Sequence, residues 1–212
     1  MKYSALILDM DGTIVDSLDA VEGALKKAGE KWGIAVTPKL LDIALYSSGD
    51  DLGRAVNLSG GDEKIFLADV ARAYHEMAHL SKLFPGIRGL LEAKISLGIV
   101  TNENRTELRH NFKRLEIDES VFGGICCAGD TPFIKPHPYP LQYCMGQMGA
   151  ARESTLFVGD GRADFLAAKA AGVSFGVALW GVRDVSLFEG AQHFFEKPGE
   201  VLRFAQVLGF RL

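Results

Sequence analysis

Ala5-Leu-Ile-Leu-Asp9-Met-Asp11-Gly12 is a short apolar run that ends in two aspartates and a glycine. A continuous run of this length, closed by a turn pair, predicts a buried β-strand that ends at the aspartates. Similar runs recur at residues 98–101, 124–127, 155–158 and 175–179. Helical patterns separate the later runs, at residues 87–96, 105–115, 140–148 and 164–171. Strands that alternate with helices predict an α/β fold, with a parallel sheet covered by helices on both faces.

One long helical segment interrupts this alternation near the start of the chain. From about Asp19 to Lys82 the apolar residues follow helical spacing, and Gly60-Gly61 separates two of the predicted helices. Pro85-Gly86 then marks the return to the alternating pattern. We therefore expect a core made of residues 1–16 and 83–212, with residues 17–82 inserted as a helical bundle.

Composition and charge exclude several classes of protein. The chain has 212 residues, is 48% hydrophobic and carries a formal net charge of -4, so it offers no basic surface for nucleic acid. Its three cysteines are an odd number without regular spacing, which argues against a disulfide framework. No signal peptide and no apolar stretch of about 20 residues is visible. The sequence thus predicts a cytoplasmic protein with no membrane partner.

Polar residues follow the predicted strands at their carboxyl ends. Asp9 and Asp11 follow the first strand, Thr101 and Asn102 end the second, and Asp160 follows the fourth. Asp164 comes four residues after Asp160, and Lys135 lies between the third and fourth strands. Because ligands bind beyond the carboxyl ends of parallel strands, we expect these side chains to meet in one crevice.

These residue types suit the transfer of a phosphoryl group. Clustered carboxylates repel one another, and a magnesium ion bound by oxygen ligands relieves the repulsion. A carboxylate can attack phosphorus, and a second carboxyl group two residues later can serve as general acid and base. Gly12 permits a sharp turn that directs backbone N–H groups toward phosphate. Thr101 can hydrogen-bond a phosphate oxygen, and Lys135 can balance its charge.

The motifs resemble those of haloacid dehalogenase-like (HAD) hydrolases. Asp-Gly alone is a common turn pair, but four motifs stand here in the family's order. They are residues 9–17, Ile99-Val-Thr-Asn102, Lys135-Pro136 and Gly159-Asp160-Gly-Arg-Ala-Asp164. The resemblance implies a Rossmann-like core, and it implies that Asp9 is the nucleophile, Asp11 the acid/base, Thr101 the phosphate anchor and Lys135 the charge stabiliser. Gly12 and Asn102 would also contact phosphate.

The resemblance also implies how magnesium is held. Asp9, Asp160 and the backbone carbonyl of Asp11 would bind the ion, and Asp164 would support it or orient Lys135. One departure is Gly161, which stands where many relatives carry serine. The inserted bundle resembles the cap of the phosphoglycolate phosphatase and β-phosphoglucomutase branch. The expected function is a magnesium-dependent phosphatase, a monomer or homodimer, that hydrolyses a small phosphorylated metabolite through an aspartyl-phosphate.

Two other functions remain open. A phosphosugar mutase shares all four motifs but usually carries a basic residue in the first loop of the cap, where this chain reads Tyr46-Ser-Ser-Gly-Asp-Asp-Leu52. A phosphate-sensing module without turnover would lack the nucleophile or the acid/base, and both are present. The acidic loop at residues 47–51 either repels a second anionic group of the substrate or caps the helix expected near Leu52.

Overall fold

The computed structural model describes residues 3–46, 49–58 and 61–208, and it divides the chain into two compact units. The larger unit comprises Met1–Val15 and Leu83–Leu212, and the smaller unit comprises Asp16–Lys82. Each unit has a hydrophobic core of its own. Among the described residues, no helix has both the length and the apolar character that crossing a membrane requires.

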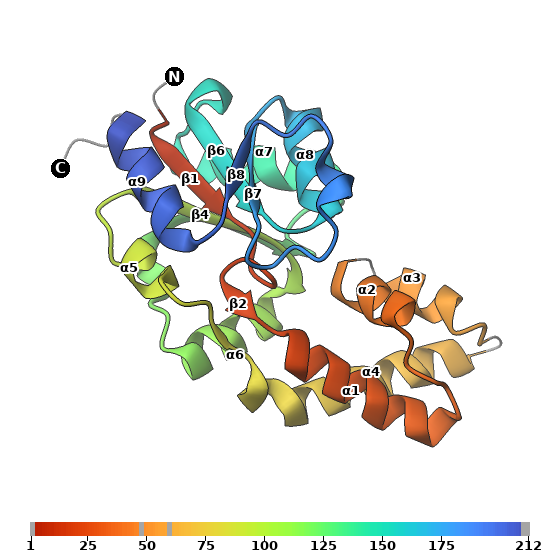
Figure 1. Cartoon of the computed structure of the whole chain (residues 1–212). Coiled ribbons are helices and arrows are strands. Elements are labelled where there is room, and N and C mark those ends of the chain that lie inside the picture. Colours follow the sequence, from red (N-terminus) through yellow and green to blue (C-terminus); the bar gives the residue numbers. More distant parts are fainter. Residues whose placement is uncertain (1–2, 47–48, 59–60, 209–212) are drawn as a thin grey trace. The chain divides into compact units, whose positions relative to one another are not determined.

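The larger unit is built on a parallel sheet of six strands in the order β5-β4-β1-β6-β7-β8 (Figure 1). The strands are β1 (Ala5–Leu8), β4 (Ser96–Asn104), β5 (Phe122–Ala128), β6 (Thr155–Gly159), β7 (Ser174–Ala178) and β8 (His193–Phe195). Parallel pairing confirms the predicted α/β class. The strand order reverses at β1, which pairs with β4 on one side and β6 on the other.

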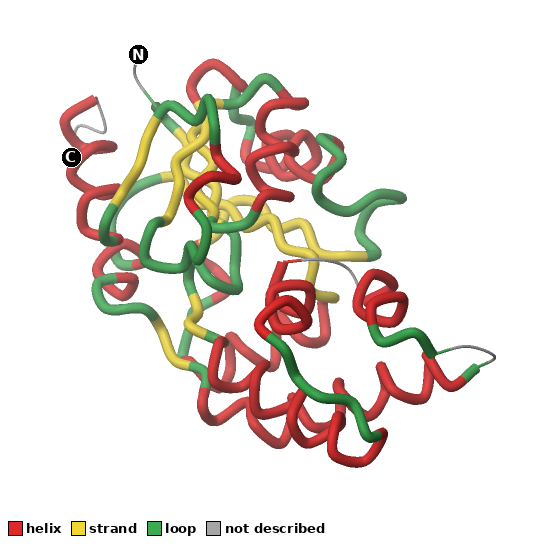
Figure 2. Tube along the Cα trace, turned by 45° about the vertical axis from the view of Figure 1, so that its right-hand side comes forward, coloured by secondary structure: helices red, strands yellow, loops and turns green. Residues whose placement is uncertain are grey.

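Helices cover both faces of this sheet (Figure 2). The helices are α5 (Ile87–Leu91), α6 (Arg105–Leu115), α7 (Tyr139–Met148), α8 (Arg162–Ala171) and α9 (Pro198–Leu208), with short 3-10 turns at Glu119–Val121, Arg152–Ser154 and Val185–Phe188. In β1, Leu6 and Leu8 pack in the core with α5 and α6, whereas Ile7 packs in the core with α7 and α8. Successive side chains of a strand point to opposite faces, so both faces of β1 are buried.

The smaller unit is helical. It contains α1 (Leu18–Trp32), α2 (Pro38–Tyr46), α3 (Gly49–Ala55), α4 (Asp62–Met77) and a 3-10 turn at Ala78–Leu80. Leu25, Leu41 and Phe66 belong to its buried core. Asp69 of α4 is 8% exposed and accepts hydrogen bonds from Lys31 Nζ at 2.6 Å and Trp32 Nε1 at 2.9 Å. These bonds join α4 to the end of α1.

The structure differs from the sequence prediction at several elements. The strand β8 has no counterpart in the prediction, because its three residues are too few for a periodic signal. The short strands β2 (Val15–Asp16) and β3 (Lys82–Leu83) form a second sheet where the expectation was turn and helix. The helix expected at 87–96 ends at Leu91, and Ser96 already belongs to β4. Finally, α3 begins at Gly49 rather than near Leu52.

The start of α3 at Gly49 changes the interpretation of the acidic loop predicted at residues 47–51. Asp51 lies in the first turn of α3, and its Oδ1 pairs with Arg54 of the same helix at 2.6 Å. Residues 49–51 of the predicted loop 47–51 therefore belong to α3, and residues 47–48 lie outside the described residues. The ion pair with Arg54 engages Asp51 within its own helix, which is a common role for an acidic residue near a helix start.

Candidate active site

Asp9 lies at the carboxyl end of β1, at the point where the strand order of the sheet reverses. Its backbone N–H donates to Val158 O of β6 at 3.0 Å, which fixes the residue just beyond the last strand pair. The side chain is 7% exposed. Such switch points are where open α/β sheets bind ligands, so the most buried carboxylate of the first motif occupies the expected place.

Lys135 reaches Asp9 from the loop between β5 and α7. Its Nζ donates to Asp9 Oδ1, lies 2.7 Å from Asp164 Oδ1 and donates to Val100 O at 3.0 Å. Two hydrogen bonds and one ion pair thus hold the ammonium group among three oxygens. The residue is 5% exposed. The carboxylates of Asp164 and Asp9 raise the pKa of Lys135 above its usual value, although burial alone would lower it.

Asp164 stands in the first turn of α8, four residues after Asp160. Its Oδ2 accepts a hydrogen bond from Gly161 N at 2.9 Å, while its Oδ1 pairs with Lys135. Oδ2 therefore has a hydrogen-bond donor, whereas Oδ1 is ion-paired with Lys135 but accepts no hydrogen bond. This geometry is compatible with both roles implied for Asp164, orientation of Lys135 and support of a metal ion.

Asp160 follows β6 and is fixed by Thr13. The Thr13 hydroxyl, which is fully buried, donates to Asp160 Oδ1 at 2.9 Å. Oδ2 of Asp160 is also buried but has no hydrogen-bond partner. A buried carboxylate oxygen without a donor is costly, and a cation is one way to satisfy it. Asp160 thus offers one oxygen for a metal ion and has the other held in place.

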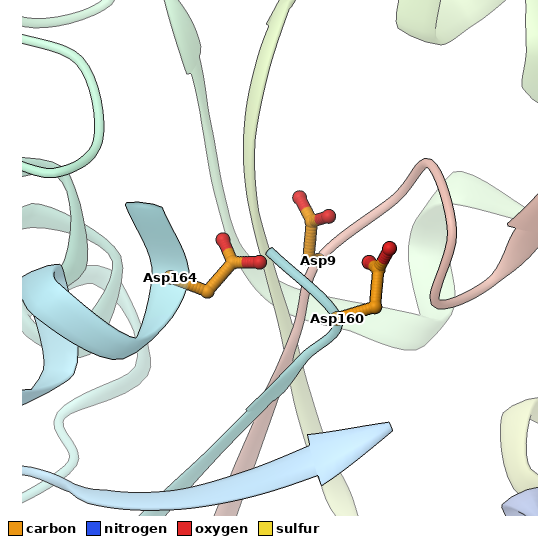
Figure 3. A group of neighbouring side chains, drawn as sticks. All are labelled: Asp9, Asp160 and Asp164. Atoms are coloured by element: carbon orange, nitrogen blue, oxygen red, sulfur yellow. The ribbon is translucent and has the colours of Figure 1, made fainter. Parts of the chain in front are cut away.

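The three aspartates form one cluster. Each of Asp9, Asp160 and Asp164 offers a carboxylate oxygen that lies within 4.8 Å of the others. Figure 3 shows Asp9 between the other two, which come from the loop after β6 and from α8. Burial, with the charge of Asp164, raises the pKa of Asp9 to about 7. Burial and the charges of Asp9 and Asp164 raise the pKa of Asp160 well above its ordinary value.

A tight turn at Met10–Val15 carries Asp11 away from the strand. Gly12 has a φ of +76°, and its N–H donates to Val15 O at 2.7 Å. The expected sharp turn is confirmed, but this bond engages the N–H through which Gly12 is predicted to bind phosphate. Trp180 Nε1 donates to Thr13 O at 2.9 Å and holds the turn from the segment after β7.

Thr101 and Asn102 lie near the end of β4, the neighbour of β1. Thr101 is 4% exposed, and its Oγ1 accepts a hydrogen bond from Glu103 N at 3.0 Å, so its hydroxyl proton can still be donated to a ligand. Asn102 Nδ2 donates to Lys135 O at 3.0 Å, and Lys135 N donates to Asn102 Oδ1 at 2.9 Å. The side chain of Asn102 therefore holds the backbone of Lys135, and its predicted phosphate contact stays a prediction.

Three residues of this region are not among the site residues expected from the sequence. Thr13 lies within the first motif and Glu103 directly follows the second, so their place at the motifs was the available signal. Trp180 has no such signal, because nothing local indicates that its indole reaches back across 167 positions to Thr13. Burial, followed by the charge of Asp11, raises the pKa of Glu103 well above its ordinary value.

Comparisons with known proteins agree with this geometry. The family model described as haloacid dehalogenase-like hydrolase matches residues 6–178. A phosphoglycolate phosphatase of Mannheimia succiniciproducens is 30% identical over 187 residues, which cover 81% of this chain and 83% of the relative. Pyrophosphatase PpaX of Oceanobacillus iheyensis is 24% identical over 192 residues, covering 88% of each chain.

A solved structure shares nearly the whole fold. The crystal structure of a putative phosphoglycolate phosphatase from Lactobacillus plantarum superposes with a TM-score of 0.87 at 28% identity, covering 96% of this chain and 99% of that one. A putative β-phosphoglucomutase from Thermotoga maritima superposes with a TM-score of 0.76 at 22% identity, and covers 98% of this chain and 99% of its own. At that identity the likeness concerns the fold alone.

Proposed function

The chain belongs to the haloacid dehalogenase-like hydrolases and is a phosphoric monoester hydrolase, and from this premise we propose that it is a magnesium-dependent phosphatase that works through a phosphorylated Asp9. The observation that carries the proposal is the buried arrangement of Asp9, Lys135 and Asp164 at the switch point of the sheet. One ammonium group shared by two carboxylates fixes the nucleophile while leaving the site anionic enough to need a cation.

The donor atoms fit a magnesium ion. All are hard oxygens, and Asp160 Oδ2 is buried without a hydrogen-bond donor. Asp9 and Asp160 would hold the ion together with the backbone carbonyl of Asp11, while Asp164 remains with Lys135 and Gly161. When bound, the ion would neutralise the carboxylates and stabilise negative charge on the phosphoryl oxygens.

In the first half-reaction, a carboxylate oxygen of Asp9 forms a bond to phosphorus as the bond from phosphorus to the leaving oxygen breaks. Asp11 donates its proton to that leaving oxygen. The Thr101 hydroxyl donates a hydrogen bond to a phosphoryl oxygen, and the Lys135 ammonium group balances the negative charge of the phosphoryl group. In the second half-reaction, Asp11 takes a proton from water, the water oxygen attacks phosphorus, and the bond to Asp9 breaks.

We propose a small phosphorylated metabolite as substrate. The net charge of -4 does not favour nucleic acid. Relatives named phosphoglycolate phosphatase and pyrophosphatase make phosphoglycolate and pyrophosphate the first compounds to assay. The mutase alternative gains nothing from Arg54, because that side chain is paired with Asp51 in its own helix.

The test is phosphate release from phosphoglycolate, pyrophosphate, hexose phosphates and nucleoside monophosphates, with magnesium and with a chelator. We expect at least one compound to be hydrolysed by wild type with magnesium, with no turnover in chelator and none by Asp9→Asn. Asp118→Asn is the matched control, because Asp118 caps an exposed 3-10 turn through Ser120 N and asparagine preserves that bond. Full turnover by Asp9→Asn would contradict the proposal.

A further inference from the structure

Lys135 is held at its backbone and at its ammonium group by the same strand, β4. Its Nζ donates to Val100 O at 3.0 Å. At the backbone, Asn102 Nδ2 donates to Lys135 O at 3.0 Å, and Lys135 N donates to Asn102 Oδ1 at 2.9 Å. Val100 and Asn102 flank Thr101, the predicted phosphate anchor. Strand β4 therefore fixes the position of the lysine relative to the threonine.

The segment that carries Lys135 gains little support from packing. Phe133 and Ile134, which precede the lysine, are 49% and 36% exposed. The hydrogen bond from His137 N to Ile134 O, at 2.9 Å, lies within the segment, so it shapes the segment without attaching it to the sheet. The two bonds with Asn102 make that attachment, because they join the backbone of Lys135 directly to β4.

The position of this backbone matters for the ammonium group. A lysine side chain is long and flexible, so a displaced backbone carries Nζ away from the place where charge develops on the phosphoryl oxygens. The carboxamide of Asn102 gives its oxygen and one proton of Nδ2 to the backbone of Lys135. This use of both ends of the carboxamide favours a role in holding Lys135 over a contact with phosphate.

We propose that Asn102 is a positioning residue for Lys135, and that its carboxamide fixes the backbone from which the ammonium group reaches the phosphoryl group. The inference rests on the proposed function, because it presupposes that Lys135 balances the phosphoryl charge. It replaces the phosphate contact that the sequence predicts for the side chain of Asn102. A group displaced by about 1 Å from its productive position can cost about 10²-fold in rate.

The contact itself is tested without turnover, through hydrogen exchange of the Lys135 amide. Ile134-Lys135 is the only Ile-Lys pair in the sequence, so isoleucine labelled with carbon-13 at its carbonyl and lysine labelled with nitrogen-15 isolate one amide signal by NMR. We expect slow exchange in wild type and much faster exchange in Asn102→Leu, which has neither donor nor acceptor. Asn102→Asp keeps the acceptor for Lys135 N and should lie between the two. Equal exchange in wild type and Asn102→Leu would overturn the inference.

The effect on catalysis is measured as release of 4-nitrophenol from 4-nitrophenyl phosphate in the pre-steady state, with magnesium. This acidic leaving group needs little proton donation, so the rate reports how well the phosphoryl charge is stabilised. We expect Asn102→Leu to be about 10²-fold slower than wild type, and Asn102→Asp to be faster than Asn102→Leu. A side chain in contact with phosphate would give the opposite order, because the new carboxylate would repel the phosphoryl group. Asn102→Asp as the slower variant therefore contradicts the proposal.

Two controls separate positioning from other effects. Asn104→Asp adds the same charge to the same strand and preserves the acceptor for Thr106 N and Glu107 N, so it should run at the wild-type rate. Calorimetric titration with magnesium shows whether the site has loosened as a whole. Asn102→Leu should bind the ion no more weakly than wild type. A fall in magnesium affinity that parallels the fall in rate would mean that Asn102 has only a structural role.

Lys135→Met supplies the reference that separates failure of this inference from failure of the proposed function. If Lys135→Met is slow and Asn102→Leu runs at the wild-type rate, Asn102 is not a positioning residue. If Lys135→Met is as fast as wild type, the proposed role of Lys135 fails and this inference fails with it. Asn102 is exposed, so its replacements should fold. Asn102→Ala also removes both bonds, and it takes the place of Asn102→Leu in every measurement if the leucine variant does not fold.

Discussion

The hydroxyl of Thr13 donates a hydrogen bond of 2.9 Å to Asp160 Oδ1, across 147 positions of sequence, and leaves Asp160 Oδ2 buried without a donor. The bond sets the orientation in which the free oxygen is presented to a cation. Partners of this kind typically affect metal affinity by about 10–100-fold when they are removed. The contribution of the Thr13 hydrogen bond can therefore be measured through the dissociation constant of the metal ion.

We expect Thr13→Val to weaken magnesium binding by about 10–100-fold, because valine keeps the shape of threonine and loses its donor. Thr13→Ser keeps the hydroxyl and should bind nearly as wild type does. Calorimetric titration with magnesium, without substrate, measures the effect directly. Equal affinity of the two variants would show that Thr13 does not orient Asp160.

Gly12→Ala should remove metal binding through a clash. A Cβ atom at Gly12 would lie 2.0 Å from Asp160 Oδ2, and the φ of +76° adds backbone strain. Gly33 has a similar φ of +66°, but a Cβ atom there would meet nothing within 4 Å, so Gly33→Ala isolates the strain. We expect Gly33→Ala to cost about 1 kcal/mol of stability and to bind magnesium normally.

The Gly12 comparison is made by urea unfolding and magnesium titration on both variants. Gly12→Ala should be less stable than Gly33→Ala and should bind no magnesium in the range where wild type saturates. If both variants bind the ion alike, the close approach of Gly12 to Asp160 has no functional role.

Lys135→Met should destabilise the protein, because it leaves Asp9 and Asp164 as buried carboxylates without their shared cation. Breaking a buried ion pair at one partner typically costs about 3–5 kcal/mol. Adding Asp164→Asn should recover part of the stability but none of the turnover. Lys169→Met, on the exposed side of α8, is the control and should change stability by no more than about 0.5 kcal/mol.

Urea unfolding in chelator tests the Lys135 prediction without interference from bound metal. A Lys135→Met protein as stable as the Lys169→Met control would mean that the ammonium group does not compensate the two carboxylates. Recovery of turnover in the double variant would equally contradict the charge-balancing role of Lys135.

The raised pKa of Asp9 predicts a pH effect on the metal-free protein. Burial raises this pKa from 3.8 to about 7, so the folded chain holds a proton that the unfolded chain releases at lower pH. The stability contributed by this proton is therefore present below pH 3.8 and is lost as the pH rises toward about 7. The difference in unfolding free energy between wild type and Asp9→Asn should fall over this interval.

Magnesium should reverse this loss, because it binds the ionised carboxylate. Unfolding is followed at about pH 5 and about pH 8, with chelator and with magnesium, for both proteins. We expect the ion to stabilise wild type more at the higher pH and to stabilise Asp9→Asn little at either. If the difference in unfolding free energy between wild type and Asp9→Asn does not depend on pH in chelator, the raised pKa of Asp9 is contradicted.

The sequence motifs predicted the main residues of the site, because these residues lie at strand ends. Asp9, Asp160, Asp164 and Lys135 meet in the structure as the parallel topology requires. Helix α6 was predicted with its observed bounds, since its apolar spacing is regular and a capping box at Asn104 and Glu107 defines its start. Patterns of this kind depend on neighbours in sequence, and local periodicity is sufficient to find them.

Contacts between distant segments could not be predicted from local sequence patterns. The hydrogen bonds from Trp180 to Thr13 and from Asn102 to Lys135 depend on how loops pack, and no local pattern encodes them. Short strands such as β8 are fixed by the sheet they join rather than by their own sequence.

The proposed mechanism depends above all on whether Asp9 becomes phosphorylated. Asp11→Asn is mixed with radiolabelled 4-nitrophenyl phosphate and magnesium, quenched in acid and digested. An acidic leaving group lets the first half-reaction proceed, while loss of the base slows the second by about 10²–10⁴-fold, so the intermediate should accumulate. We expect label on the peptide that contains Asp9, and none when Asp9→Asn is added. An unlabelled protein that still releases phosphate at the wild-type rate would contradict the mechanism.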